Sequence, residues 1–414
     1  MKKIVTVCLL FAVLALLLPA FSACGGGGET VTLYVYNWGE YISDGTEGSL
    51  DVNAAFEEWY FREYGQRVEV NYSTYSSNED MYAKISSGAS NYDIVIPSDY
   101  MIARMIEEEL LRPLNLENIP NTQYIDLTAM FGDQMPYYDP TNSYSVPYTY
   151  GTVGIIYNTT MVDEADLGTW DIMWNEKYTG NVLQFNNSRD AFATALFKLG
   201  YSVNTENEAE WREALALLMT QKPIVQGYVM DEIFNKMENG SAAIAPYYAG
   251  DFFTMYADNE DLGFCYPTEG TNVFVDAMCV PASSQNPEIA ERYINFMLSK
   301  EAAIANAEYI CYASPNRLVT EDEDYRATME EIHPDAMEIL YGTEDIPMEF
   351  YENLPEERLM LLNSLWEDLK IESPINTSII VMAGVILGGG VFAGVFFTVR
   401  GRKRRRIVAT LWDN

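Results

Sequence analysis

Hydrophobic positions along the chain follow two alternating periodicities, which together predict its elements. Residues 31–36 alternate and are rich in β-branched and aromatic side chains, as in a buried first strand. Strand-like and helical segments then alternate along the chain. We expect helices at 49–63, 78–87 and 101–110 and strands at 67–72 and 92–96. Asn78 stands at the start of its helix and is expected to cap it. This β-α-β-α order predicts a mostly parallel sheet with helices on both faces.

A second alternating set follows, and two extended segments separate it from the rest. Residues 144–154 are apolar and interrupted by glycines, which suits a strand that leaves one lobe and enters another, and residues 273–281 are a second candidate crossing. Between them we expect strands at 182–185, 224–228 and 242–246 and helices at 188–199, 208–220 and 231–238. A further helix, 287–298, has proline in its first turn. The pattern predicts two α/β lobes.

The N-terminal residues have the features of an export signal. A basic start and the apolar run 4–18 are followed by small residues before Cys24. Phe-Ser-Ala-Cys at 21–24 resembles a bacterial lipobox, so we expect residues 1–23 to be a lipoprotein signal peptide and Cys24 to be acylated. Residues 24–30 form a glycine-rich spacer. An ordinary signal peptide with an incidental cysteine is the alternative.

The C-terminal residues contain a second candidate membrane element. Residues 375–399 carry no charged side chain. This segment is long enough to form a transmembrane helix. The basic tail 400–414 follows and is expected in the cytoplasm by the positive-inside rule. Gly384 and Gly388 offer a small-residue face for helix packing, and a plain anchor and a buried soluble helix are the alternatives.

Charge is distributed unevenly along the 414 residues. The chain has 25 basic and 61 acidic residues. Residues 25–374 contain 17 of the basic residues and 60 of the acidic ones. Such an acidic body does not seek nucleic-acid phosphates and would attract polycations. Solubility alone is the simpler explanation of the same charge. The 48% hydrophobic content argues for a folded core rather than a disordered acidic chain.

Candidate chemistry follows the first expected strand directly. Trp38, Glu40 and Tyr41 bring an aromatic face, a carboxylate and a phenol within four residues. An alkylammonium ligand is recognised by such a set, because its methylenes and cation need a π-face and its amine needs an anion. Local packing of Trp38 is the alternative. Loops at the carboxyl ends of strands form the ligand crevice of open α/β sheets, which favours the ligand interpretation.

Cysteine and histidine usage argues against catalysis and against a metal site. Cys265, Cys279 and Cys311 have no metal-ligand spacing, and we expect buried free thiols, although one pair could form a disulfide bond. His333 is the only histidine and is expected at the surface or at a helix start. No Walker A pattern occurs, so the sequence gives no sign of a phosphate-binding loop for nucleotide hydrolysis. We expect neither an enzyme nor a cofactor; a carboxylate-based hydrolase is the less favoured alternative.

Several segments resemble the spermidine/putrescine-binding protein of polyamine ABC transporters. They occur in order over about residues 30–370 and include YVYNWGEY (34–41), YSTYSSNEDMYAK (72–84), YDIVIPSDY (92–100), 144–154, RDAFATALFKLGYSVN (189–204) and YASPN (312–316). The resemblance implies the two-lobed periplasmic-binding-protein fold of type II, with a mixed sheet in each lobe and two crossovers. The implied lobes are 31–149 with 275–320, and 150–274 with 321–371. Ligand would lie in the cleft, closed by a hinge motion.

The resemblance also implies the ligand contacts. Matching the motifs position by position gives Trp38, Glu40, Tyr41, Ser98, Tyr100, Asp190, Tyr248, Asp251, Phe274, Asp276, Tyr312 and Glu352. Family members often have serine or threonine where this chain has Gly39. Asn187 is uncharged where spermidine-preferring members have an acid, whereas Asp251 resembles an acid of putrescine-preferring members. The resemblance implies no metal-binding residue.

The expected function is therefore that of an extracellular polyamine receptor. It would bind putrescine or spermidine and deliver it to ABC permease subunits served by a separate ATPase, while Cys24 and 375–399 hold it at the cell membrane. A membrane-anchored receptor or sensor for another cationic amine remains open. The choice between putrescine and spermidine also remains open, because Asn187 and Asp251 favour the former and Glu352 offers an additional charge.

Overall fold

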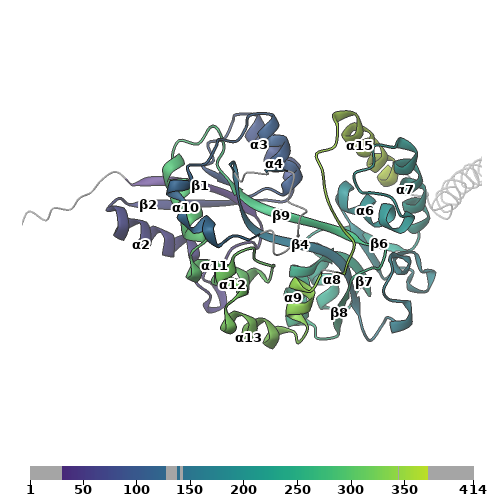
Figure 1. Ribbon diagram of the computed structural model, residues 1–414. Coiled ribbons are helices and arrows are strands. Elements are labelled where there is room, and N and C mark those ends of the chain that lie inside the picture. Colours follow the sequence, from purple (N-terminus) through teal and green to yellow (C-terminus); the bar gives the residue numbers. More distant parts are fainter. Residues whose placement is uncertain (1–29, 127–137, 140–142, 344, 372–414) are drawn as a thin grey trace, which may run out of the picture. The chain divides into compact units, whose positions relative to one another are not determined.

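The computed structural model describes residues 30–126, 138–139, 143–343 and 345–371 (Figure 1). The described chain forms two compact units. Unit 1 contains the described residues up to Val153, together with Tyr248–Glu260 and Asn272–Asn353. Unit 2 contains Gly154–Tyr247, Asp261–Thr271 and the described residues from Leu354 on. Each unit contains both strands and helices.

In the sheet of unit 1, β1 (Val31–Trp38) is the second strand from one end of the strand order. Along one side β1 pairs in parallel with β2 (Val68–Tyr75), from Val31 opposite Val68 to Trp38 opposite Tyr75. On its other side lies the short parallel strand β3 (Ile94–Val95), followed by β9 (Thr271–Cys279) and β4 (Ser145–Asn158), which run antiparallel to their neighbours. The sheet is therefore mixed, and the expected parallel β1–β2–β3 part is present.

Helix α2 (Val52–Tyr64) shows how local sequence positions the elements of unit 1. The Asp51 side chain accepts a hydrogen bond from Ala54 N and caps the helix, which ends where Gly65 adopts φ 70°. The buried ring of Phe56 packs on Tyr293 at a centroid distance of 4.9 Å and on Phe296 at 5.7 Å. Burying such a side chain contributes roughly 1.5–3 kcal/mol, so α2 is fixed against the helix that carries Tyr293.

Helix α3 (Asn78–Ser86) corrects one prediction. Ser77, not Asn78, is its N-cap, because the Ser77 hydroxyl accepts a hydrogen bond from Asp80 N at 3.1 Å. Asn78 is the first helical residue, and its buried side chain points into the unit instead of capping the helix. Ser77 and Asn78 could each cap the helix. Asn78 is buried, and its polar groups need hydrogen-bond partners inside the unit, so Ser77 is left as the cap.

The other elements of unit 1 cover the sheet and close the unit. They are α4 (Asp99–Glu107), α9 (Ala249–Asp258), α10 (Pro287–Met297), α11 (Lys300–Ile310), α12 (Arg317–Thr320), α13 (Glu323–Ile332), α14 (Ala336–Tyr341) and β10 (Met348–Phe350). The core contains Leu33, Val35 and Ile94 from the strands. His333, expected at the surface, is half-buried against the rings of Tyr256 and Phe252 in α9.

Unit 2 has a parallel core of three strands. Strand β5 (Val182–Phe185) pairs in parallel with β6 (Val225–Val229) and β7 (Ile244–Tyr248), and β8 (Leu262–Cys265) runs antiparallel to the second half of β4. Its helices are α6 (Ser188–Leu199), α7 (Glu208–Gln221), α8 (Glu232–Glu238) and α15 (Glu356–Ile371). Leu365 and Leu369 of α15 pack with Phe192 and Trp211 in the core of this unit.

The units divide the chain differently from the expected lobes. Residues 321–353 and 248–260 belong to unit 1, whereas the resemblance placed them in the second lobe. Helix α13 packs against α11 and α9, which ties these segments together. Of the three cysteines in the described chain, Cys279 and Cys311 are buried, Cys265 is half-buried, and all three are free thiols.

The expected membrane elements lie outside the described residues. This applies to the signal peptide 1–23, Cys24, the segment 375–399 and the tail 400–414. Among the helices that the structure does describe, none combines the length and apolar character needed to cross a bilayer. The spanning helix therefore stays a prediction from the sequence.

Candidate functional site

Asp276 forms the centre of the candidate site in unit 1. Strand pairing places it in β9 opposite Thr149 of β4 and in a bridge with Ser98. Its side chain is only 3% exposed. The Ser98 hydroxyl donates to Oδ1 at 2.7 Å, and the Tyr41 hydroxyl donates to Oδ2 at 2.7 Å. Three residues predicted to contact ligand, distant in sequence, therefore share one hydrogen-bond network.

Thr149 extends this network and was not predicted. Its hydroxyl lies 2.6 Å from the Tyr41 hydroxyl. A phenol has one proton to donate, and Tyr41 donates it to Asp276, so Thr149 must be the donor to Tyr41. The buried Thr149 therefore fixes the direction in which the Tyr41 hydroxyl points. Its position in a crossing strand gave no sequence signal beyond strand propensity.

The electrostatics of Asp276 are those of a carboxylate that lacks a cation. Burial raises the pKa of Asp276 from 3.8 to about 6, although the hydrogen bonds from Ser98 and Tyr41 lower it. In the described part of the chain no lysine, arginine or histidine forms an ion pair with this carboxylate. Burial, followed by the charge of Asp276, raises the pKa of Tyr41 well above 10. Tyr41 therefore stays a neutral donor, and the site keeps a net negative charge above pH 6.

Asn78 supports the two site residues of the second motif. The Asn78 amide donates to the Ser98 hydroxyl and to the Tyr100 hydroxyl, both at 3.1 Å, and its Oδ1 accepts from Ser98 N at 3.1 Å. Tyr100 also donates to the carboxylate of Glu79 at 3.0 Å. Asn78 thus holds Ser98 and Tyr100 together. The sequence offered a signal for it, an amide at a helix start, but capping was the simpler interpretation.

The first loop is fixed by hydrogen bonds from three directions. The Trp38 indole donates to Ile96 O at 2.9 Å, and Tyr41 O accepts from the Asn37 amide at 3.3 Å and from the Tyr148 hydroxyl at 3.0 Å. Glu40 adopts φ 51° and its side chain is exposed. A non-glycine residue in this left-handed region is uncommon, and the contacts of its neighbours hold it there. Trp38 is half-buried beside Tyr75 at a centroid distance of 4.6 Å.

Four predicted aromatic residues form a connected wall beside Asp276. Tyr41 contacts Tyr312 edge-on at 5.1 Å, Tyr312 lies 6.3 Å from Phe274, and Phe274 contacts Tyr248 edge-on at 5.4 Å, all between ring centroids. We call these four rings the aromatic wall. They come from the first loop, the segment after α11, β9 and the end of β7, so only the fold brings them together.

Two glycines make room for the aromatic wall. A Cβ atom at Gly250 would lie 2.2 Å from the Tyr312 ring, and one at Gly151 would lie 2.6 Å from the Phe274 ring. Neither distance occurs between real Cβ atoms and their neighbours. Gly151 stands directly opposite Phe274 in the β4–β9 ladder. The absence of a side chain at both positions therefore leaves the space that the Tyr312 and Phe274 rings occupy.

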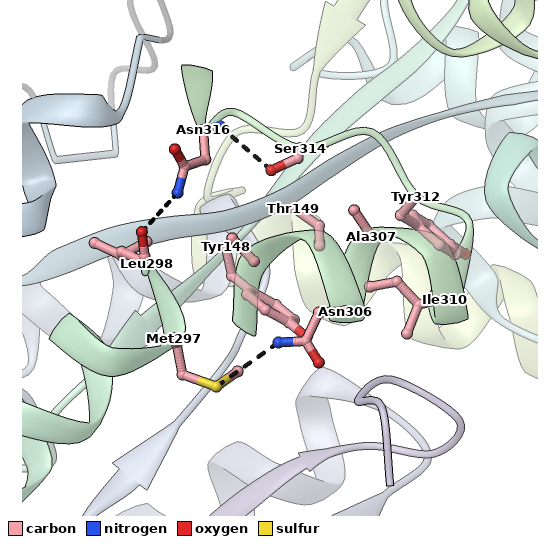
Figure 2. A pocket seen from close by; sticks show the side chains of 11 residues that line it. Tyr148, Thr149, Met297, Leu298, Asn306, Ala307, Ile310, Tyr312, Ser314 and Asn316 are labelled. Carbon is pink, nitrogen blue, oxygen red and sulfur yellow. Dashed lines mark hydrogen bonds between the residues drawn. The ribbon is translucent and has the colours of Figure 1, made fainter. Parts of the chain in front are cut away.

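A small internal cavity borders the network (Figure 2). Its lining includes Thr149, Tyr148 and Tyr312, and its volume is about 10 Å³. Figure 2 also shows the Asn306 amide directed to the sulfur of Met297, at 3.8 Å. This volume accommodates about one water molecule. The cavity is therefore too small for a diamine and is not itself the ligand site.

The remaining predicted residues lie outside this network. Asp251 is half-buried in the first turn of α9, and Glu352 is exposed next to Tyr351, whose ring contacts Tyr100 edge-on at 6.2 Å. Asp190 belongs to unit 2, where its backbone N–H donates to Asn187 Oδ1 at 2.9 Å and the Asn187 amide donates to its carboxylate. Asn187 is the N-cap of α6, which gives this uncharged residue a structural role.

The two-unit α/β fold, with a buried carboxylate beside an aromatic wall, is that of a solute-binding protein. The chain belongs to the family of bacterial extracellular solute-binding proteins, whose model matches residues 53–331. A similar relative is the spermidine/putrescine-binding periplasmic protein of Salmonella typhimurium, 32% identical over 316 residues, with 75% of this chain and 85% of the relative covered. The putrescine/cadaverine-binding protein of Pseudomonas aeruginosa is 28% identical, with 86% and 99% covered.

Solved structures agree with this family. The chain resembles the substrate-binding protein of a spermidine/putrescine ABC transporter from Streptococcus pneumoniae, with 34% identity, a TM-score of 0.65 and coverage of 82% of this chain and 99% of that one. It also resembles a lipoprotein of Treponema pallidum, with 27% identity, a TM-score of 0.67 and the same coverage. The resemblance inferred from the motifs is thus confirmed, as is the two-domain α/β binding-protein fold.

Proposed function

We propose that this protein is an extracellular receptor that binds a polyamine and delivers it to an ABC importer. The single observation that carries the proposal is Asp276, a buried carboxylate whose hydrogen-bond donors are the neutral hydroxyls of Ser98 and Tyr41. Removing such a charge from water costs several kcal/mol unless an opposite charge compensates it. An ammonium group supplies both the positive charge and further hydrogen-bond donors.

The aromatic wall suits the rest of a polyamine. Tyr248, Phe274 and Tyr312 offer apolar ring surface for the methylene chain, and the faces of such rings attract a cation. Trp38 is proposed as a further ring, and Glu40 and Asp251 as carboxylates that hold a second amine. Tyr100, Glu352 and, in unit 2, Asp190 are proposed contacts from the family resemblance. A sugar or an anion would leave Asp276 without a counter-charge.

Putrescine is the ligand that we propose first. Asn187, where spermidine-preferring members have an acid, is used here as a helix cap for α6. Asp251 remains as a carboxylate of the kind expected in putrescine-preferring members. A diamine needs two anionic partners, whereas a triamine needs a third. The exposed Glu352 is the candidate for this third partner if spermidine binds.

Membrane attachment is a further part of the proposal and rests on the sequence alone. Acylation at Cys24 and a spanning helix at 375–399 would hold the receptor beside its permease. Two variants, Cys24→Ser and a chain that ends at residue 374, test the two anchors separately. Each single variant is expected in the membrane fraction and the combination in the soluble fraction. Soluble protein from the full-length chain would contradict both anchors.

Calorimetry on residues 25–374 tests the proposal directly. Putrescine, spermidine and cadaverine are titrated separately, with glutamate and maltose as anionic and neutral controls. We expect at least one polyamine to bind with a Kd of about 1 μM or below, corresponding to roughly 8 kcal/mol or more. Binding should disappear in Asp276→Ala. Unchanged affinity in that variant would show that the site is assigned to the wrong residues, and the absence of any polyamine binding would reject the function.

A further inference from the structure

The chain that follows the first loop is closed by local hydrogen bonds. Ser43 O accepts from Val52 N at 3.1 Å, and the Ser43 hydroxyl donates to Leu50 O at 2.6 Å. We call residues 43–52 the Ser43 loop. These two bonds hold the loop to itself, so its position relative to Asp276 depends on contacts with other elements of unit 1.

Asn306 of α11 connects the Ser43 loop to this helix. Its Oδ1 accepts from Ser43 N at 3.0 Å, and both side chains are buried, with Asn306 only 2% exposed. Because a backbone N–H can only donate, the oxygen end of the amide must face Ser43, and the nitrogen end then donates to the sulfur of Met297 at 3.8 Å. A buried N–H without an acceptor is costly, so the bond from Ser43 to Asn306 fixes the loop firmly.

Tyr309 holds the same loop at its exposed end. Its hydroxyl lies 2.6 Å from the Thr46 hydroxyl. Tyr309 follows Asn306 by three positions and so lies on the same face of α11. Water can replace an exposed hydrogen bond, whereas the buried bond of Asn306 has no such substitute. Asn306 is therefore the stronger of the two anchors.

Two buried anchors act on the backbone next to Tyr41. Tyr41 O accepts from the Tyr148 hydroxyl at 3.0 Å, and Ser43 N, two positions later, is held by Asn306. Asn306 and Tyr148 both line the small cavity that also borders Thr149 (Figure 2). Its volume of about 10 Å³ leaves little space for these side chains to move. The backbone from residue 41 to residue 43 is thus fixed at both ends.

The C-terminal end of α11 leads to the aromatic wall. The helix ends at Ile310, and Cys311 adopts the left-handed conformation with φ 57°, which turns the chain towards Tyr312. The Tyr312 ring contacts the Tyr41 ring edge-on at 5.1 Å. One helix therefore carries both the side chain of Asn306, which anchors the chain beyond Tyr41, and the ring that packs on Tyr41.

We propose that Asn306 is a positioning residue that holds the Tyr41 hydroxyl against Asp276. Tyr41 donates to Asp276 Oδ2 at 2.7 Å. A hydrogen bond weakens steeply when its distance or angle departs from the optimum, so a small shift of the backbone at Ser43 is enough to impair it. Asn306 touches no ligand in this role. It prepares a donor of the proposed polyamine site, and its effect on affinity rests on that proposed function.

Carbon-13 NMR on the full, ligand-free chain tests the role of Asn306. Aspartate is labelled at Cγ, and Asp276→Asn assigns the Asp276 signal. The hydrogen bond from Tyr41 lowers the pKa of Asp276, so weakening this bond must raise the pKa. In Asn306→Ala we expect the midpoint of the Asp276 titration to move upward by about 0.5–1 pH unit. Calorimetry with putrescine at pH 6 should show about a two- to fivefold loss of affinity, because less of the carboxylate is ionised.

Asn316→Ala is the matched control. Asn316 is equally buried, at 2% exposure, and lines the same cavity, but its amide donates to Leu298 O at 2.9 Å and its Oδ1 caps α12. Its loss should lower the stability and leave the Asp276 midpoint where it is in the parent. If Asn306→Ala does not fold, Asn306→Ser, which keeps a hydroxyl in the cavity wall, takes its place with the same expected shift.

A double-mutant cycle with Tyr41→Phe shows whether Asn306 acts through Tyr41. Tyr41→Phe removes the bond to Asp276, so adding Asn306→Ala should cause no further shift of the midpoint. The inference is overturned if Asn306→Ala leaves the midpoint unchanged, if Asn316→Ala moves it equally, or if Asn306→Ala causes its full shift in the Tyr41→Phe background. A midpoint shift in a protein that binds no putrescine would reject the proposed function and support the positioning role.

Discussion

The Tyr41 hydroxyl donates to Asp276 Oδ2 at 2.7 Å across 235 positions of the sequence. This bond joins the first loop to the second half of unit 1, and the bond from Thr149 to Tyr41 sets its direction. Ser98 completes the set of donors. A carboxylate held by neutral hydroxyls in a dry site is prepared for a cation, because its orientation is fixed before the ligand arrives.

Asp276→Asn should abolish polyamine binding and stabilise the ligand-free protein. The pKa of about 6 exceeds the ordinary 3.8 because burial disfavours the charge. This shift of about 2 units corresponds to up to about 3 kcal/mol of destabilisation at neutral pH. We expect urea unfolding at pH 7.5 to show a gain of about 1–3 kcal/mol in the variant. Calorimetry should show no heat of binding with putrescine.

Asp93→Asn is the matched control for this substitution. Asp93 is also a buried carboxylate of unit 1, but it accepts from Ser284 Oγ at 2.7 Å and from the backbone N–H groups of Asn286 and Tyr34 at 3.0 and 3.1 Å. In Asp93→Asn the new amide N–H groups would face the backbone N–H donors. The free energy of unfolding should therefore fall by roughly 1–3 kcal/mol. If both variants were destabilised alike, Asp276 would be a structural residue like Asp93.

Binding should weaken as the pH falls through 6. A polyamine stays protonated in this range, whereas the Asp276 carboxylate gains a proton and loses its attraction for the ligand. One carboxyl predicts about a tenfold loss of affinity per pH unit below its pKa. Calorimetric titrations with putrescine at pH 7.5, 6 and 5 measure this loss of affinity.

The same group has the opposite effect on the stability of the ligand-free protein. Its folded-state pKa lies above the unfolded value, so the folded state binds more protons between pH 3.8 and about 6. The contribution of Asp276 to stability therefore increases as the pH falls from 7 towards 4. Comparing the parent with Asp276→Asn isolates this contribution. A pH-independent difference in unfolding free energy between the two proteins would contradict the raised pKa.

Gly250→Ala should impair the aromatic wall. The new Cβ would lie 2.2 Å from the Tyr312 ring, so the ring or α9 must move. Overpacking of this kind costs roughly 1–3 kcal/mol, which exceeds the gain of about 0.5–1 kcal/mol from replacing a helical glycine. We expect lower stability by urea unfolding and at least a tenfold loss of putrescine affinity, equivalent to about 1.4 kcal/mol.

Gly39→Ala controls for the removal of a glycine near the ligand. No atom lies within 4 Å of the position of a Cβ at Gly39, and its φ is not positive. Its unfolding free energy should stay within about 0.5 kcal/mol of the parent. Equal affinities for Gly250→Ala and Gly39→Ala would mean that the position of Tyr312 does not matter for binding.

Asn78→Ala should weaken binding by releasing Ser98 and Tyr100. It removes an amide that donates to both hydroxyls, and it leaves Ser98 N without its acceptor. We expect a loss of stability of roughly 1–3 kcal/mol and a clear fall in putrescine affinity. Ser77→Ala, which removes the N-cap of the same helix, should cost about 1 kcal/mol and leave affinity unchanged. A similar fall in affinity in both variants would point to α3 as a whole rather than to Asn78.

The sequence determined the order of elements and the class of ligand. Predicted segments at 182–185 and 188–199 coincide with β5 and α6, because strong hydrophobic periodicity and an N-cap define both ends. The acidic composition and the run of aromatic residues indicated a cationic solute, since charge and ring chemistry do not depend on the fold.

Only the tertiary structure decided which of the many carboxylates lacks a counter-charge. The register of β9 places Asp276 opposite Thr149 and beside Ser98, whereas Asp93, similarly buried, receives backbone donors. Sequence patterns give the period of an element but not the partners that its side chains meet. Asn78 shows the same limit, because helix capping and support of Ser98 use the same amide, and the choice between them depends on a residue twenty positions away in the sequence.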